Sequence, residues 1–308
     1  MPSRRLLLAC LALGASMPSF ATEPAHTPTP SELLAASRPD EWRRPDPRNL
    51  LQMELPGGRV LIELAPDYAP LHAANLRTLA HEHYFDGLSI NRVQDNFVTQ
   101  WDDPATDADP VDTRHLKPLG SAKASLPPEF TRAIDPQRPW TPLPDGDVYA
   151  PQVGFDQGFP AAHDPASGQT WLAHCYGMVG VARDIDPQSG NGSALYAVIG
   201  QAPRGLDRNL AVVGRVIEGM ELLSGLPRGP APMGFYTRPE QRVPIRSLRL
   251  AADLPESERA HVEVLRTDSA TFAALVEARR NRRDAFYRVP AGKVDLCAIA
   301  IPSRTARP

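Results

Sequence analysis

The stretch LPGGRVLIELAPDYAPLHAANLRTLAHEHYFDGLSINRV, residues 55–93, contains the clearest structural pattern in the chain. An alternating apolar run precedes a turn at 56–58, and the apolar run 60–64 follows it, which predicts a β-hairpin. Apolar residues at helical spacing then predict a helix over 69–83, and 88–93 is typical of another strand. This order predicts a helix that covers one side of a sheet.

The rest of the chain is rich in short strand patterns and poor in helices. Further strands are expected at 97–101, 177–182, 195–199, 211–217, 243–250 and 294–301. Helices are expected over 218–226 and 268–286, the second with Asp268 or Ser269 as its N-cap. The pattern indicates a mainly β protein, either an antiparallel barrel or a sandwich, with covering helices.

The composition limits the classes of partner. The chain has 308 residues and a net charge of −3, and no basic stripe marks a nucleic-acid interface, so no nucleic acid is expected. Proline is abundant, at 34 residues, which favours loops and strand edges over helices.

The N-terminus has the features of an export signal in their usual order. Arg4 and Arg5 precede an apolar stretch over 6–17, and Ala21 ends a run that a signal peptidase accepts. We therefore expect a signal peptide over 1–21 and a protein that is periplasmic in a bacterium with two membranes. The apolar stretch is too short to span a bilayer, so no membrane anchor is expected, and neither is an oligomer: a monomer is predicted.

Two cysteines follow the expected signal peptide, Cys175 and Cys297. In an exported protein they permit one disulfide, while two buried free thiols are an equally good interpretation. A zinc site that includes His174 and Cys175 lacks the paired ligand spacing of such sites, so no metal is expected.

The segment INRVQDNFVTQWDDP, residues 90–104, predicts a second hairpin with Arg92 on one arm and Gln100 on the other. If Val93 faces Phe97 across the turn, Gln100 is the diagonal neighbour of Arg92. Diagonal neighbours lie about 7–8 Å apart at the backbone, within reach of two long side chains. A hydrogen bond between the guanidinium and the amide is therefore expected.

Two interpretations of this hairpin remain open. In one, Arg92 is an immobilised cation beside an apolar wall that Phe97 and Val98 provide. In the other, Arg92 is a surface residue that pairs with Asp95 or Asp102, as exposed ion pairs commonly do without much effect on stability.

Several separate blocks, in order, resemble the cyclophilin family of peptidyl-prolyl cis-trans isomerases. They are residues 55–93 above, NFVTQWDD (96–103), GMVGVARDIDPQSGNGSALYAVIG (177–200) and LDRNLAVVGRVIEGMELLSGL (206–226). The resemblance covers roughly 50–102 and 177–250. It implies a closed eight-stranded antiparallel barrel with two covering helices.

Carried over residue by residue, the resemblance makes Arg92 the catalytic arginine and Gln100 the glutamine that supports it. The implied substrate contacts are Phe97, Val98, Ala194, Tyr196, Leu206 and Leu210, with Tyr196 in place of the phenylalanine at the floor of the proline pocket. Ala194 replaces the usual glutamine, Gly205 stands where many members have tryptophan, and Leu210 where many have histidine. These changes leave fewer polar contacts to the residues before proline, and they predict reduced or altered activity.

The resemblance implies an enzyme that accelerates X-Pro isomerisation in folding exported proteins. Its partners are proline-containing unfolded or folding polypeptides. No bond is broken in this reaction, so no nucleophile, metal or cofactor is expected. The alternative is a catalytically weak proline-binding chaperone or scaffold on the same barrel. A serine hydrolase is disfavoured because the chain has no Gly-x-Ser-x-Gly elbow.

Changes in pattern divide the chain further. Residues 22–47 predict a Pro-rich linker, 48–254 the cyclophilin-like barrel, and 255–308 a C-terminal extension of a helix and a strand. Within the barrel, 104–170 loses regular pattern and predicts a long loop insertion. We hypothesise that this insertion packs beside the active face and narrows or extends the peptide groove. The alternative is a surface loop without such a role.

Overall fold

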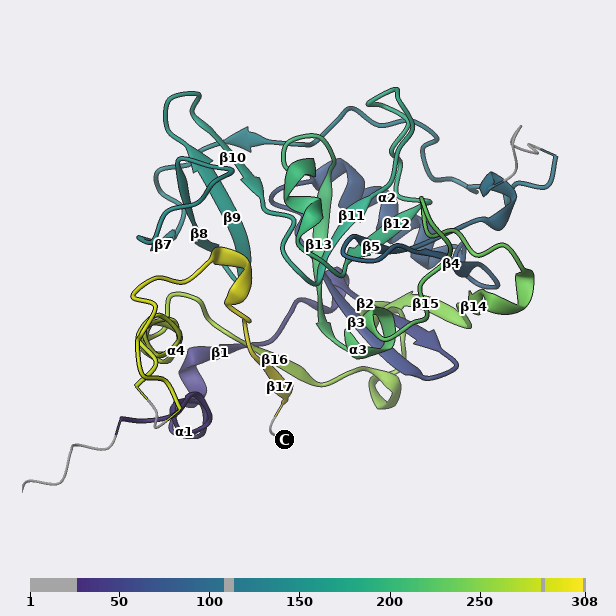
Figure 1. Cartoon of the computed structure of the whole chain (residues 1–308). Coiled ribbons are helices and arrows are strands. Elements are labelled where there is room, and N and C mark those ends of the chain that lie inside the picture. The colour runs from purple at the N-terminus through teal and green to yellow at the C-terminus, as the bar shows by residue number, and fades with distance from the viewer. Residues whose placement is uncertain (1–26, 108–113, 284–285, 307–308) are drawn as a thin grey trace, which may run out of the picture.

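The computed structural model describes residues 27–107, 114–283 and 286–306, and the expected signal peptide 1–21 lies outside them (Figure 1). The largest element is a nine-stranded antiparallel sheet that curls around a core. In the order of hydrogen-bonded neighbours, its strands are β14 (Val243–Pro244), β4 (Ser89–Val93), β5 (Val98–Asp102), β12 (Leu195–Val198), β11 (Met178–Val181), β13 (Val212–Glu218), β3 (Gly58–Leu64), β2 (Leu50–Leu55) and β15 (Ser247–Leu250).

The two end strands of this order, β14 and β15, are separated in the chain only by Ile245 and Arg246. The amide of Ile245 donates to the segment before β4, and the amide of Arg246 donates to β2, so successive amides serve the two edges. The expected single strand over 243–250 is therefore two strands, and Pro244 has no N–H with which to continue the first. The structure shows a curled sheet of nine strands, and its closure into the implied eight-stranded barrel stays a prediction.

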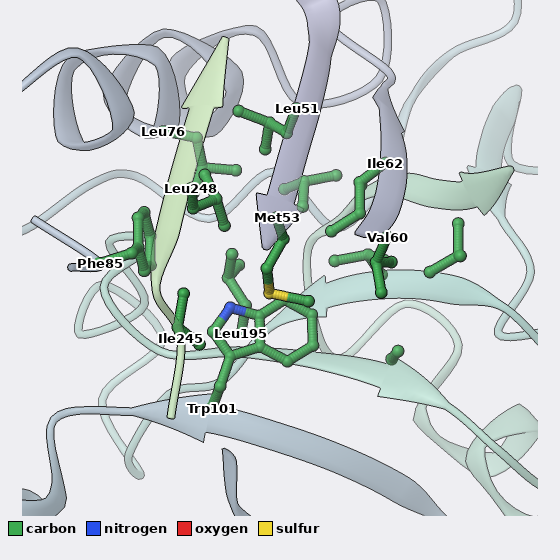
Figure 2. Close-up of a cluster of buried hydrophobic side chains, with 14 of the residues drawn as sticks. Leu51, Met53, Val60, Ile62, Leu76, Phe85, Trp101, Leu195, Ile245 and Leu248 are labelled. Carbon is green, nitrogen blue, oxygen red and sulfur yellow. The ribbon is translucent and has the colours of Figure 1, made fainter. Parts of the chain in front are cut away.

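The inside of the curled sheet holds a hydrophobic core that α2 (Pro70–His81) covers (Figure 2). The expected helix over 69–83 is thus confirmed with slightly shorter bounds. Its side chains come from α2, from five strands of the sheet and from two connecting segments: Leu51, Met53, Val60, Ile62, Leu76, Phe85, Trp101, Leu195, Ile245 and Leu248. The first hairpin follows the predicted alternation, because every second residue of each of its strands points into this core.

The start of α2 depends on a distant residue. Ala69 at its N-cap has no side-chain acceptor, and Glu129 supplies one instead. The two carboxylate oxygens of Glu129 accept from the amides of Leu71 and His72, each at 2.9 Å, and one of them lies 2.6 Å from Nδ1 of His72. A carboxylate at this end also complements the helix dipole.

A second sheet forms where the sequence predicted a structureless insertion, and that prediction is wrong. Its strands, in neighbour order, are β6 (Arg132–Ala133), β10 (Gln169–Leu172), β9 (Phe159–Asp164), β8 (Gln152–Asp156) and β7 (Thr141–Leu143). Gln157 and Gly158 join β8 to β9 with positive φ angles of 48° and 94°, as in a two-residue hairpin turn. Pro142 is tolerated because β7 is an edge strand. Short strands that contain proline hid this sheet from pattern reasoning.

A third sheet joins the two ends of the described chain. It consists of β1 (Trp42–Arg43), β16 (Val262–Leu265) and β17 (Ser303–Thr305), in that order. Beside it, α1 (Pro30–Ala35) packs against α4 (Ala270–Arg280), whose N-cap is Ser269 (Figure 1). The described part of the expected linker 22–47 is therefore structured, because its strand pairs with the C-terminal extension.

The expected helix over 268–286 ends as a helix at Arg280, and the strand expected over 294–301 is wrong. The side chain of Asp295 accepts from the amide of Cys297 and caps a short 3-10 helix there instead. The remaining short helices are α3 (Glu221–Ser224), where a helix over 218–226 was expected, and 3-10 segments at Pro39–Glu41, Pro47–Asn49, Pro104–Asp107, Ala202–Leu206, Pro239–Gln241, Ala251–Asp253, Glu256–Glu258 and Leu296–Ala298.

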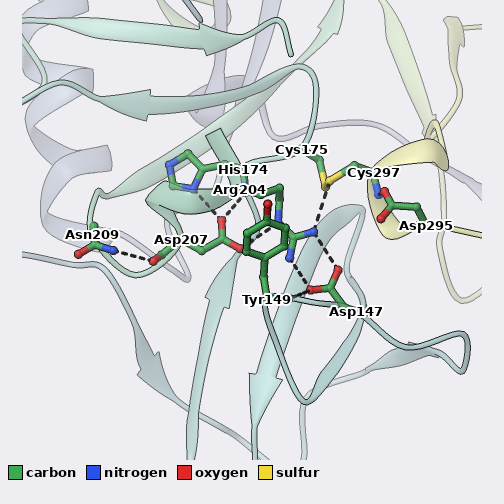
Figure 3. A network of polar contacts seen from close by, with 9 residues as sticks. All are labelled: Asp147, Tyr149, His174, Cys175, Arg204, Asp207, Asn209, Asp295 and Cys297. Atoms are coloured by element: carbon green, nitrogen blue, oxygen red, sulfur yellow. Dashed lines mark hydrogen bonds and ion pairs between the residues drawn. A yellow bond between two sulfur atoms is a disulfide. The ribbon is translucent and has the colours of Figure 1, made fainter. Parts of the chain in front are cut away.

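A disulfide between Cys175 and Cys297 links the chain before β11 to the C-terminal extension. The disulfide interpretation of the two cysteines is thus confirmed. The bond spans 122 residues of sequence and connects the curled sheet to the segment that lies beside the second sheet (Figure 3).

Candidate active site

Arg92, Gln100 and Tyr196 form a row across three neighbouring strands. Arg92 on β4 lies directly opposite Gln100 on β5, and Gln100 lies directly opposite Tyr196 on β12. Directly opposed residues project from the same face of a sheet, so the three side chains stand side by side. Here they are on the outer face, since the core residue Trp101 points inward.

The expected register of this hairpin is off by two residues. Val93 faces Thr99, not Phe97, and the pairing is irregular between Ile90 and Arg92. The turn is longer than expected because Asn96 adopts a left-handed conformation, with φ of 50°. Gln100 therefore lies directly opposite the arginine and not diagonally from it.

Three acceptors hold the Arg92 guanidinium. Nη1 donates to Oε1 of Gln100 at 3.0 Å, Nε donates to the carbonyl of Met233 at 2.7 Å, and Nη2 donates to Oε1 of Gln94. The rings of Phe235 and Phe97 lie 5.1 and 5.7 Å from the guanidinium carbon. The immobilised-cation interpretation is thus confirmed, and burial lowers the pKa of Arg92 while Asp102 opposes that shift.

The alternative pairing of Arg92 with Asp95 is not observed. Asp95 lies on the exposed turn and pairs with Arg228, with Nε and Oδ1 3.1 Å apart. Asp102 binds the partner of Arg92: its Oδ2 accepts from Nε2 of Gln100 at 2.8 Å. With its NH₂ group on Asp102, Gln100 must present its oxygen to Arg92, which fixes the orientation of the amide.

Tyr196 ends the row and is almost completely buried. Its ring lies over Gly180, the opposed residue on β11, where any Cβ would collide with the phenol. Val98, predicted as a pocket residue, is buried in the same hydrophobic cluster, and half-buried Phe97 and Leu210 pack against it. The structure thus brings four of the six predicted substrate contacts into one cluster.

The other two predicted contacts lie apart from this cluster. Ala194 and Leu206 are both half-buried. Ala194 precedes β12, and Leu206 is the last residue of the 3-10 segment Ala202–Leu206. The substrate-binding roles of all six residues stay predictions.

A chain of polar contacts that sequence reasoning missed leads away from Tyr196, and Figure 3 shows the part of it from His174 to Asp147. The Tyr196 hydroxyl lies 2.9 Å from Nε2 of His174, and Nδ1 of His174 lies 2.9 Å from Oδ1 of Asp207. Oδ2 of Asp207 accepts from Nε of Arg204 at 3.0 Å, and both Nη atoms of Arg204 donate to Asp147, at 2.9 and 2.8 Å. No local spacing signals this network, because its members span 147–207.

Within this network Asp207 stays charged. Burial works to raise the pKa of Asp207, but hydrogen bonds from His174 and the charge of Arg204 outweigh it and leave the pKa below its ordinary value. Burial, with help from the Asp207 charge, raises the pKa of the Tyr196 phenol. The phenol therefore stays protonated, and the two ring nitrogens of His174 lie within hydrogen-bond distance of Tyr196 and Asp207.

The second sheet packs against the outer face of the curled sheet near this row. Phe155 on β8 and Trp171 on β10 belong to the same buried cluster as Val98 and Tyr196. The insertion therefore lies where our hypothesis placed it, beside the predicted active face. Its effect on the peptide groove stays a prediction.

Comparison with known proteins identifies the family. The model of the cyclophilin type peptidyl-prolyl cis-trans isomerase family matches residues 50–250. The chain belongs to the cyclophilin family. It is accordingly a peptidyl-prolyl cis-trans isomerase with a mainly β cyclophilin fold and few helices.

Individual cyclophilins support the same assignment. A probable peptidyl-prolyl cis-trans isomerase of Brucella suis biovar 1 (strain 1330) is 27% identical over 186 residues, which cover 60% of this chain and 74% of the relative. The crystal structure of cyclophilin AquaCyp293 from Hirschia baltica matches with a TM-score of 0.68 and 28% identity, over 91% of this chain and 99% of that one. The alignment with AquaCyp293 covers a larger share of this chain than the family domain does.

Proposed function

We propose that this cyclophilin accelerates X-Pro isomerisation during the folding of exported proteins, with Arg92 as the catalytic donor. One observation carries the assignment of Arg92: its guanidinium is immobilised yet not saturated. A guanidinium has five N–H groups, and the three hydrogen bonds to Gln100, Gln94 and Met233 leave two for a peptide. The planar fork of donors is one that a lysine could not reproduce.

The chemistry requires only such a donor. Resonance gives the peptide bond a barrier of about 18–20 kcal/mol, and twisting the X-Pro bond removes that resonance. The proline nitrogen then regains its lone pair and becomes a better hydrogen-bond acceptor. A donor fixed beside it stabilises the twisted state more than either planar isomer, and the barrier falls. The acceptors that hold Arg92 keep the cost of reorganisation small.

The test is isomerisation of a proline tetrapeptide by the purified protein and its Arg92→Ala variant. We expect Arg92→Ala to lose most of the turnover and to keep the circular dichroism spectrum of the wild type. Arg228→Ala is the matched control, since Arg228 is a more exposed arginine that pairs with Asp95 on the same turn. Wild-type turnover in Arg92→Ala, or unfolding of that variant, would contradict the assignment.

A second candidate function is that of a catalytically weak proline-binding chaperone or scaffold. It is favoured by Ala194, Gly205 and Leu210, which replace polar or aromatic residues that many cyclophilins have at these positions. This function predicts that proline peptides bind but that their isomerisation is accelerated very little. Exchange spectroscopy by NMR measures both quantities in one sample and separates the two candidates.

The place of action is also part of the proposal. Arg4, Arg5 and the apolar stretch 6–17 support export, and the Cys175–Cys297 disulfide fits an oxidising compartment such as the periplasm. Across the described residues, no helix has the length and apolarity needed to cross a membrane. We propose a periplasmic monomer, for which mass spectrometry should find a mature N-terminus near residue 22 and size exclusion a single-chain mass.

A further inference from the structure

The loop between β7 and β8, residues 144–151, is fixed at the site by a buried ion pair. The Asp147 side chain is only 1% exposed and accepts from both Nη atoms of Arg204, which is 2% exposed. Bidentate pairs of this kind add geometric specificity to their attraction. Since Arg204 belongs to the 3-10 segment that ends at Leu206, the loop is held against a predicted wall of the substrate site.

The same loop presents apolar surface to solvent next to that wall. The Tyr149 ring lies on the Arg204 guanidinium, 4.6 Å from its central carbon, and remains 45% exposed (Figure 3). Its amide donates to Asp147 at 2.7 Å, which sets the direction of the chain at this point. Val148, between them, is 91% exposed. We call Asp147, Val148 and Tyr149 the 147–149 segment.

The surface is also open at the residue after Arg204. Gly205 follows Arg204 in the chain, is exposed, and a Cβ built on it would meet nothing within 4 Å. Arg204 thus carries the Tyr149 ring on its side chain and is followed in the chain by an open, exposed glycine, while exposed Val148 is the chain neighbour of Tyr149. The polar chain through Asp207 and His174 ties Arg204 rigidly to Tyr196 in the catalytic row.

We propose that the 147–149 segment is a specificity subsite that binds an apolar or aromatic side chain of the substrate next to the proline. Tyr149 is the main contact, Val148 adds apolar surface, and Arg204 and Asp147 are positioning residues. The proposal rests on the proposed isomerase function, because the subsite serves the peptide whose proline lies at Arg92. A ring already stacked on a guanidinium loses little freedom when it binds, so an aromatic partner gains the usual stacking energy at low entropic cost.

The experiment compares peptides of the form Ala-X-Pro-Y in which X or Y is phenylalanine or glycine, one position varied at a time. Both kcat/KM and Kd are measured by NMR exchange and titration. At one flanking position, we expect the wild type to prefer phenylalanine over glycine, and Tyr149→Ser to reduce that preference about five- to tenfold, while Tyr149→Phe retains it. Glycine peptides should change less than about twofold, since they make no stacking contact.

Tyr287→Ser is the matched control. Tyr287 is another exposed tyrosine stacked on an arginine, with the carbon of Arg282 4.0 Å from its ring, and it lies in the C-terminal extension. It should leave the preference unchanged. Equal losses on phenylalanine and glycine peptides in Tyr149→Ser, or no loss on either, would overturn the subsite. If the wild type turned over no peptide, the isomerase proposal would fail, and equal Kd values for the two peptides would then decide against the subsite independently.

Discussion

Replacing Gln100 by leucine should lower kcat/KM for a proline tetrapeptide about tenfold. Gln100 accepts from Nη1 of Arg92 at 3.0 Å, and both side chains are buried. A hydrogen bond to a charged group contributes about 1.5–3 kcal/mol. Arg92 keeps its bonds to Met233 and Gln94, so the lower end of that range applies, and about 1.4 kcal/mol corresponds to a tenfold change in rate.

The assay is a double-mutant cycle of Gln100→Leu and Arg92→Ala, with NMR exchange as the readout. If Gln100 acts by holding the guanidinium, Gln100→Leu has less than about a twofold effect once Arg92 is absent. Gln52→Leu serves as the control, because Gln52 is a buried glutamine that bonds to the backbone of Glu258 and Ala260. Gln52→Leu should lower the free energy of unfolding and leave the turnover unchanged. The same tenfold loss in both Arg92 backgrounds would refute the reasoning.

Three further predictions concern stability. Replacing both Cys175 and Cys297 by alanine frees a 122-residue loop and should lower the free energy of unfolding by about 4 kcal/mol in urea titrations; a change below about 1 kcal/mol would contradict this. Glu129→Gln weakens the cap on α2 and should lower the free energy of unfolding by about 1–2 kcal/mol; an unchanged melting temperature would contradict this. Backbone hydrogen bonds, first that from Arg38, lower the pKa of Glu41 from 4.5 to about 2, so its carboxylate stabilises the fold above pH 4.5 and this contribution is lost as the pH falls towards 2. Between pH 5 and 2.5, the free energy of unfolding should therefore fall less in Glu41→Gln than in the wild type. An equal fall in the two proteins would contradict this role of the Glu41 carboxylate.

Local physics determined the parts of the fold that the sequence predicted. The alternation around the first hairpin and the helical spacing of 69–83 are periodic signals within about a dozen residues, and β2, β3 and α2 follow them closely. The Arg92–Gln100 contact was predictable for the same reason, since a tight hairpin brings its two arms together whatever the rest of the chain does. Even there the register depended on Asn96, whose left-handed conformation lengthens the turn.

Other parts of the fold depend on contacts between residues far apart in the sequence, and only the tertiary structure determined them. The two residues of β6 carry no periodicity and become a strand because they pair with β10, some 36 positions later in the chain. The network from Tyr196 to Asp147 likewise joins residues that share no spacing pattern, and side chains of the insertion are buried in the same cluster as Tyr196. The sequence left the disulfide open between two states of its cysteines. The fold chose one by bringing two Cα atoms that are 122 residues apart to within 4.8 Å, a distance that chain connectivity alone does not impose.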